Sequence, residues 1–299
     1  IGRLDPTTVD DLVVSGGSVS QFGYRTTIRV VGGPDGTLGF REQASDRVVP
    51  VTSCPVAESK LSRLLAIVEV DEGAELTVRT SVATGAVTAI WDKRFRGAIR
   101  GLPSDVHIGE RAWLTERVAG CDLRVSAGSF FQSGAQAAEL LVAAVRGAAP
   151  ELAGARHGLD AYGGVGLFAV TAMAGCERVT VIESNASACR DAERNLAGRD
   201  AHVVRAEVTG WTPPAGDGPT PPVDVVVADP ARGGLAKPGV AALAAAGSPV
   251  MVLVSCDPVS MARDTVLLAD AGYRPERVEV FDLYPNTHHV ETVSRFVHP

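Results

Sequence analysis

The sequence predicts an α/β protein in which a doubly wound, mostly parallel sheet follows a smaller β-rich or α+β domain. After residue 128, short Val-rich runs alternate with helical stretches. Nearly continuous apolar strands of this kind are buried on both faces by covering helices. Before residue 128, apolar and polar residues alternate in short runs bounded by Gly, Pro and Asp, which predicts strands. We therefore expect an accessory domain over 1–128 and a larger α/β domain over 129–299.

Each predicted element follows from its local pattern. The strands of the first domain are expected at 24–31, 36–40, 47–51, 75–82 and 86–91. In the second domain, strands are expected near 157–164, 178–184, 201–206, 223–230, 249–258, 277–285 and 291–299. Helices are expected near 136–148, 186–198, 240–246 and 260–271. The Pro- and Gly-rich stretch 212–222 predicts a loop.

Composition sets limits on the class of protein. Apolar residues make up 45% and charged residues 21%, as in ordinary globular proteins. No run of about 18 apolar residues and no signal-peptide pattern is visible, which favours a cytoplasmic protein, and a monomer is the default expectation. Five scattered cysteines without a CxxC pair favour reduced thiols. The chain begins at Ile1, which suggests a fragment of a longer protein.

The net charge of −7 argues weakly against nucleic-acid binding, but the distribution of charge matters more than the sum. Two local basic stretches leave room for an RNA-facing patch. Their members are Lys93, Arg94, Arg96 and Arg100 around Phe95, and Arg25, Arg29, Arg41 and Arg47.

A glycine-rich turn marks the predicted cofactor site. Gly163, Gly164 and Gly166 follow the first strand of the α/β domain, where such sheets bind their ligands. The next strand ends at Glu183, whose carboxylate can accept hydrogen bonds from both hydroxyls of a ribose. The turn predicts a nucleoside-containing cofactor. Because residues 164–169 also match the dinucleotide fingerprint, S-adenosylmethionine and a nicotinamide both remain open on this motif alone.

Two residues are candidates for chemistry. Cys256 follows a hydrophobic strand and precedes a predicted helix, so we expect backbone N–H groups and the helix dipole to lower its thiol pKa. Glu291 lies near the end of the chain, where a hairpin would bring it to the same crevice. The adjacent His288 and His289 lack a third ligand at useful spacing, so no metal site is expected.

In sequence order, several rare motifs resemble the RNA 5-methyluridine methyltransferase family. The resemblance runs from about Tyr24 to the end. It rests on SFFQSG (129–134), LDAYGGVG (159–166), VIES (181–184), ADPAR (228–232), SCDP (255–258), MARD (261–264) and FDLYPNTHHVET (281–292). It implies S-adenosylmethionine as cofactor and a uridine of ribosomal or transfer RNA as substrate.

The resemblance also implies roles for individual residues. Cys256 matches the nucleophile that adds to carbon 6 of uracil, and Glu291 matches the base that removes the carbon 5 proton. Asp229 and Arg232 are positioned to orient the uracil or the cofactor, and Phe130 and Phe131 are candidates to stack on an extruded base, with a core role expected for at least one. The positions that match cofactor contacts are Gln132, Tyr162, Gly164, Gly166, Glu183, Glu207 and Asp229.

Some family members bind an iron–sulfur cluster near the N-terminus, and Cys54 resembles the last of its four ligands. One matched thiol does not make a cluster site, so we expect none in this chain. Two other functions stay open. A nicotinamide-dependent oxidoreductase would share the glycine turn but leave ADPAR, SCDP and HHVET unexplained. A non-catalytic RNA-binding protein could retain the fold without turnover.

Overall fold

The computed structural model describes residues 11–42, 45–92, 95, 97–213 and 221–298. The chain divides into two compact units. The C-terminal unit comprises 1–19, 118–121 and 137–299, and the N-terminal unit comprises 20–117 and 122–136. This division differs from the predicted boundary at 128, because the first described strand belongs to the C-terminal unit and the segment up to 136 belongs to the other.

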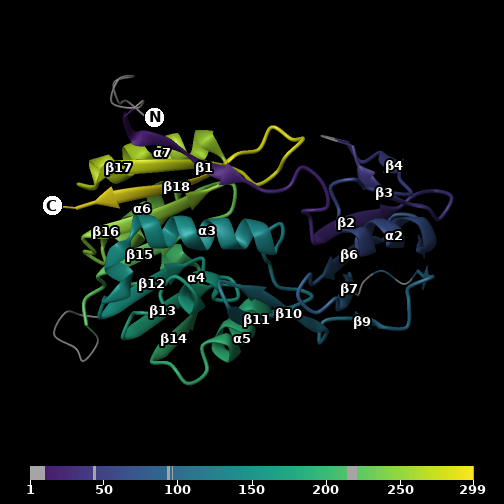
Figure 1. Cartoon of the computed structure of the whole chain (residues 1–299), viewed down its shortest axis with the longest axis horizontal. Helices are drawn as coiled ribbons and strands as arrows, with labels where there is room; N and C mark the ends of the chain where they lie inside the picture. Colours follow the sequence, from purple (N-terminus) through teal and green to yellow (C-terminus); the bar gives the residue numbers. More distant parts are fainter. Residues whose placement is uncertain (1–10, 43–44, 93–94, 96, 214–220, 299) are drawn as a thin grey trace. The chain divides into compact units, whose positions relative to one another are not determined.

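The C-terminal unit is built on an eight-stranded sheet with the order β1-β17-β18-β16-β15-β12-β13-β14, and β18 runs antiparallel to its neighbours β16 and β17. All the other neighbouring strands pair in parallel. The strands are β1 (Val13–Ser18), β12 (His157–Ala161), β13 (Arg178–Glu183), β14 (Ala201–Arg205), β15 (Val225–Ala228), β16 (Val250–Ser255), β17 (Arg274–Asp282) and β18 (Glu291–Val297). Figure 1 shows the central strands side by side, with helices over the sheet.

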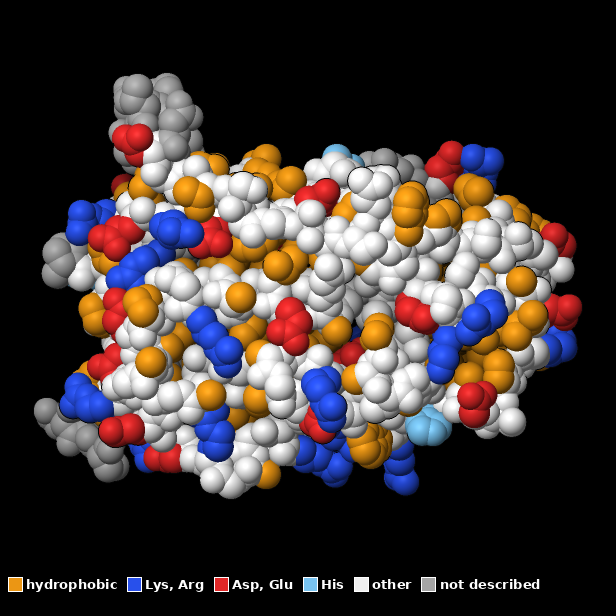
Figure 2. Space-filling view, viewed as in Figure 1, with side chains coloured by type: hydrophobic (Ala, Val, Ile, Leu, Met, Phe, Trp, Pro, Cys, Tyr) orange, Lys and Arg blue, Asp and Glu red, His pale blue; other side chains and the backbone are white. Residues whose placement is uncertain are grey.

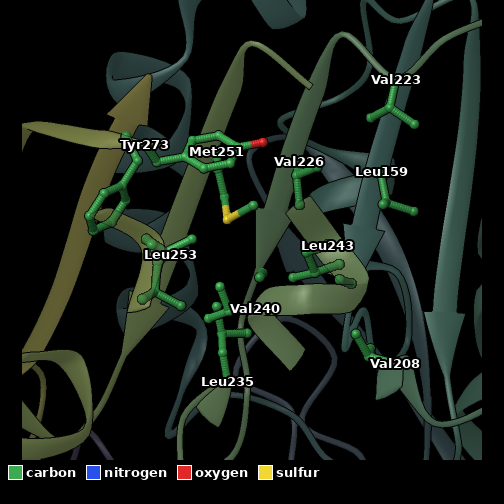
Figure 3. Packing of buried hydrophobic residues seen from close by; sticks show 14 of the residues in the cluster. Leu159, Val208, Val223, Val226, Leu235, Val240, Leu243, Met251, Leu253 and Tyr273 are labelled. Atoms are coloured by element: carbon green, nitrogen blue, oxygen red, sulfur yellow. The ribbon is translucent and has the colours of Figure 1, made fainter. Parts of the chain in front are cut away.

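The helices of this unit cover the sheet because its central strands are apolar along their whole length. Every residue of β15 and β16 is buried, which requires cover on both faces. On one face, Leu243 of α6 belongs to the same buried cluster as Met251 and Leu253 of β16 (Figure 3). Leu268 of α7 is a further member of this cluster. The helices are α3 (Ala135–Ala148), α4 (Leu167–Val170), α5 (Ala186–Asn195), α6 (Ala236–Ala244) and α7 (Pro258–Asp270), with 3₁₀ turns at Pro150–Ala153 and Val208–Gly210.

The N-terminal unit contains a six-stranded sheet with the order β4-β3-β2-β6-β7-β9 and two smaller pairings, β10-β11 and β5-β8. Helix α2 (Ser59–Ile67) begins after Glu58, whose carboxylate accepts from the Lys60 amide, and it buries Leu61, Leu64 and Leu65 in the core of this unit. The strands are β2 (Thr27–Gly32), β3 (Leu38–Arg41), β4 (Val48–Pro50), β5 (Glu69–Val70), β6 (Glu75–Thr80), β7 (Val87–Trp91), β8 (Ile99–Arg100), β9 (Val106–Ile108), β10 (Trp113–Val118) and β11 (Cys121–Ser126).

The predicted α/β and β-rich elements are therefore confirmed in kind, with shifted bounds. Helix α6 begins at Ala236 rather than at 240, and α7 begins at Pro258 rather than at 260. Seven residues of the predicted loop, 214–220, lie outside the described residues. None of the helices in the described part of the chain is long and apolar enough to cross a membrane.

The expected basic patch is largely compensated by acidic partners. Arg41 pairs with Asp46 and Glu75, Arg47 with Glu42, and Arg100 with Asp71. Lys93, Arg94 and Arg96 lie outside the described residues. Figure 2 shows basic and acidic side chains interspersed on the face in view. Because acidic side chains lie beside these arginines, the arginine-rich strands do not form a basic surface by themselves.

Candidate active site

The candidate site lies at the edge of the C-terminal sheet where its parallel strands end. Because β18 is antiparallel, the residue at its start meets the residues that follow the ends of its neighbours. Seven sequence-predicted residues come to this edge directly from strand ends. They are Tyr162 and Gly164 after β12, Glu183 ending β13, Glu207 after β14, Asp229 after β15, Cys256 after β16, and Glu291 beginning β18.

The glycine-rich turn departs sharply from the end of β12. Tyr162 has φ 60° and Gly164 has φ 56°, a left-handed backbone conformation that is costly for most side chains. A Cβ added to Gly164 would have no neighbouring atom within 4 Å, so this face of the turn is open to a ligand. At Gly163, an added Cβ would meet the Val181 side chain at 2.6 Å and Asp160 at 2.9 Å. The turn therefore requires glycine at 163 for packing, and Gly164 presents bare backbone to the site.

Glu183 fastens this turn to the neighbouring strand. Its Oε2 accepts from the Gly164 amide at 3.0 Å, and its Oε1 accepts from the Asn185 amide at 2.6 Å. Each carboxylate oxygen has a further lone pair, so both can still accept from hydroxyl groups of a ligand. Burial, followed by the charges of Glu207 and Asp264, raises the pKa of the Tyr162 phenol, which places Tyr162 and Glu207 within electrostatic reach of each other.

Several carboxylates lie within electrostatic reach of one another around the turn. Asp160 is completely buried, and its Oδ1 has no hydrogen-bond partner among the described residues. Burial, and then the charges of Asp229 and Glu183, raise the pKa of Asp160 to about 7. Such a concentration of like charge favours a positively charged ligand and disfavours a pyrophosphate. This group of carboxylates therefore fits a sulfonium-bearing nucleoside better than a nicotinamide dinucleotide.

Cys256 and Glu291 are brought together by strand pairing. Ser255 of β16 is directly opposite Thr292 of β18, and the Thr292 hydroxyl donates to the Ser255 carbonyl at 3.3 Å. The next residue in one strand and the preceding residue in the other are therefore neighbours. Glu291 is buried and Cys256 is a half-buried free thiol. This arrangement sets a thiol beside a carboxyl group, although 34 residues separate them in the chain.

The expectation that the helix would lower the pKa of Cys256 is wrong for the ligand-free protein. Burial, followed by the charges of Glu291 and Asp229, raises that pKa, against an opposing effect of Arg232. Asp257 is the N-cap of α7, and its own carboxylate accepts from the Ser260 amide at 2.9 Å. The helix start is thus capped by an anion, which offsets the dipole that was expected to act on the thiol.

Burial and Asp229 likewise raise the pKa of Glu291 well above the usual range of a carboxyl group. Glu291 and Cys256 are therefore both predominantly protonated at neutral pH before any ligand binds. A cation bound near Asp229 would stabilise the ionised form of both groups. Ligand binding and activation of the two groups are consequently linked by electrostatics.

Arg232 approaches the same region from the loop after β15. Its guanidinium lies 3.1 Å from Nε2 of His289, and its carbonyl accepts from the Ser260 hydroxyl at 2.9 Å. Asp264, whose role the sequence did not suggest, orders the rest of this loop. Its carboxylate accepts from the amides of Leu235 at 2.6 Å and Ala236 at 3.0 Å. The MARD motif was the only signal in the sequence for this contact.

Gly166 is the residue before α4 and has φ 84°. The other predicted site residues belong to the N-terminal unit. Gln132 and Phe131 are buried there, whereas Phe130 is 67% exposed. Cys54 is a half-buried free thiol in the same unit. Over the described residues, no group of three or more His, Cys, Asp or Glu side chains is arranged to hold a metal ion.

The sheet order, its one antiparallel strand near the edge and the glycine turn after β12 define a class I methyltransferase fold. No family model matches the chain. An RNA methyltransferase of Streptomyces avermitilis is 33% identical to it over 91% of the chain and 66% of that relative. A 23S rRNA (uracil(1939)-C(5))-methyltransferase of Chromohalobacter salexigens is 28% identical over 96% of the chain and 67% of the relative.

A solved structure agrees with these relatives. The tRNA (uracil-54, C5)-methyltransferase of Pyrococcus abyssi, in complex with S-adenosyl-L-homocysteine, superposes with a TM-score of 0.72 at 28% identity, covering 96% of this chain and 78% of that one. The chain is therefore similar to RNA methyltransferases, including two named as uracil-C5 methyltransferases of ribosomal and transfer RNA. It spans 66% of the Streptomyces avermitilis relative and 63% of an RNA methyltransferase of Streptomyces coelicolor that is also 33% identical, in both cases less than two thirds of the relative's length.

Proposed function

We propose that this protein transfers a methyl group from S-adenosylmethionine to carbon 5 of a uridine in RNA, through a covalent bond between Cys256 and carbon 6. The observation that carries the proposal is the pairing of Cys256 with Glu291 at the strand edge that also bears the glycine turn and Glu183. The related uracil-C5 methyltransferases support the choice of base and atom.

The residues divide the reaction between binding and chemistry. When bound, S-adenosylmethionine supplies an electrophilic methyl group on a positively charged sulfur. Glu183 accepts from its ribose hydroxyls, Gly164 allows close approach to the backbone, and Tyr162, Glu207 and Asp229 line the same edge. Gln132 is assigned to the same cofactor by resemblance alone.

Carbon 5 of uracil is too weak a nucleophile to react unaided. Addition of the Cys256 thiolate to carbon 6 gives an enolate whose electron pair forms the bond from carbon 5 to the methyl group. Glu291, as its carboxylate, then takes the proton from carbon 5, and the electrons of that C–H bond expel the thiolate from carbon 6. Arg232 and Asp229 are assigned to orient the uracil. Of the two candidates to stack on the base, Phe131 is the weaker and Phe130 the stronger, because Phe131 is buried and Phe130 is exposed.

The first experiment measures transfer of radiolabelled methyl from S-adenosylmethionine to unmodified bacterial ribosomal and transfer RNA, supplied separately. Digestion and mass spectrometry should identify 5-methyluridine in one RNA pool. Label in another nucleoside would contradict the proposed atom. Tight cofactor binding with no label in either pool would favour the non-catalytic RNA-binding alternative for this chain.

Cofactor affinity should depend strongly on Glu183. A Glu183→Gln substitution replaces one charged acceptor oxygen by an amide donor, and hydrogen bonds to charged groups contribute about 1.5–3 kcal/mol. We expect the Kd for S-adenosylmethionine to rise by about 10- to 100-fold in calorimetric titrations. The exposed Glu193→Gln on α5 is the matched control and should bind normally. Equal affinity in both variants would remove Glu183 from the cofactor site.

The rate should rise with pH. The pKa values of Cys256 and Glu291 are both raised, and both groups act in their deprotonated forms. Below its pKa, each group loses about tenfold in active fraction per pH unit. We therefore expect single-turnover release of 5-methyluridine at saturating cofactor, which needs both groups, to increase from about pH 6 to about pH 8. A flat profile over this interval would contradict the need for both deprotonations.

A further inference from the structure

A buried arginine in the N-terminal unit holds a turn of the backbone by three hydrogen bonds. Arg79, in β6, is 4% exposed. Its guanidinium donates to the carbonyls of Ser126 at 3.1 Å and Ser129 at 2.7 Å, and to the Thr27 hydroxyl at 3.0 Å. The Ser129 amide also donates to the Ser126 carbonyl at 3.0 Å. Arg79 therefore binds both ends of a single turn that follows β11.

A buried carboxylate accompanies this arginine. Glu116 of β10 has no exposed surface, and neither of its oxygens has a hydrogen-bond partner among the described residues. The Ser81 hydroxyl, which acts to lower the pKa of Glu116, also donates at 2.6 Å to the Thr115 carbonyl. Burial raises the pKa of Glu116 to about 7, and the charge of Arg79 is the leading effect that opposes this rise. Glu116 therefore lies within electrostatic reach of the Arg79 guanidinium.

The turn leads directly into the segment 129–134, which carries the SFFQSG motif. At the other end of that segment, the Ser133 carbonyl accepts from the Thr26 amide at 2.8 Å. A Cβ at Gly134 would meet the Tyr24 carbonyl oxygen at 2.3 Å, so this end is closely packed. Between the two fixed ends, the structure exposes Phe130 and buries Phe131 and Gln132.

We infer that Arg79 is a positioning residue that fixes the conformation of 129–134 for methyl transfer. The inference rests on the proposed function. A buried charge is weak evidence for stability alone, since its desolvation cost offsets the attractions it makes. A planar guanidinium that reaches three acceptors does, however, fix geometry in a way that an apolar side chain or an ammonium cannot. Misplacement of a positioning group by about 1 Å costs roughly 10²-fold in rate.

The test compares Arg79→Met, Arg79→Lys and Glu116→Gln with Arg117→Met as the matched control. Arg117 is the residue next to Glu116 on β10, and it is paired with Asp122 on the surface at 2.7 Å. We expect Arg79→Met to lower kcat by roughly 10²-fold. Arg79→Lys should restore part of this loss, and Glu116→Gln should lower kcat by a smaller factor. Arg117→Met should match the wild type.

Hydrogen exchange provides a readout that does not depend on catalysis. Amides of 126–134 should exchange faster in Arg79→Met, while those of β12, β15 and β16 keep wild-type protection. If Arg79→Met does not fold, Arg79→Lys and Glu116→Gln supply the same comparison. Folded variants with kcat within twofold of the wild type and unchanged exchange over 126–134 would overturn the inference. A wild-type protein that methylates no RNA would instead contradict the proposed function, and the exchange result would still decide the role of Arg79.

Discussion

Replacement of Cys256 by alanine is expected to abolish methyl transfer, with a loss on the order of 10⁴-fold or more, because the proposed reaction begins with addition of the Cys256 thiolate to carbon 6. The fold should survive, since the thiol is only half buried and makes no hydrogen bond that shapes the turn. Single-turnover transfer from radiolabelled cofactor to RNA measures the rate, and calorimetry should show that cofactor binding persists.

The matched control is Cys121→Ala, which removes a half-buried free thiol of β11 and should leave the rate unchanged. If 5-methyluridine still forms at a rate within about tenfold of the wild type in Cys256→Ala, the reaction does not proceed through this thiol. A simultaneous loss of cofactor binding would point to a structural effect, which a Cys256→Ser variant of nearly the same shape would resolve.

Replacement of Glu291 by glutamine should stop the reaction at a later point. Cys256 can still add to carbon 6 and carbon 5 can still take the methyl group, but the carbon 5 proton lacks its base. We expect turnover to fall by about 10²–10⁴-fold. A covalent complex of protein and RNA should accumulate, visible as a slow band on a denaturing gel and carrying the label from the cofactor methyl group.

The order of events is tested by combining variants. The double variant Cys256→Ala, Glu291→Gln should form no covalent band. Glu279→Gln, which alters a carboxylate of β17 paired with Arg277, should behave as the wild type. A Glu291→Gln protein that releases 5-methyluridine at the normal rate would assign proton removal to another group.

The sequence determined the parts of the site that lie next to strand ends. Val-rich runs predicted buried parallel strands, and the residues following such runs must gather at one edge of the sheet. Local periodicity alone predicts the places of Glu183 and Cys256, whereas Asp229 was singled out by the resemblance. Glu291 needed the further step of a closing hairpin, which the resemblance supplied and the antiparallel pairing of β18 explains.

Other features depended on tertiary structure. Strand β1 joins the C-terminal sheet beside β17, although about 260 residues separate them, and no local pattern encodes such a pairing. The pKa of Cys256 rises rather than falls, because burial and two carboxylates from distant strands outweigh a helix start that Asp257 already caps. In the sequence, nothing distinguishes Arg79 from the other arginines of the predicted strands. Long-range packing, which local propensity does not specify, buries its guanidinium where it donates to the carbonyls of residues 126 and 129.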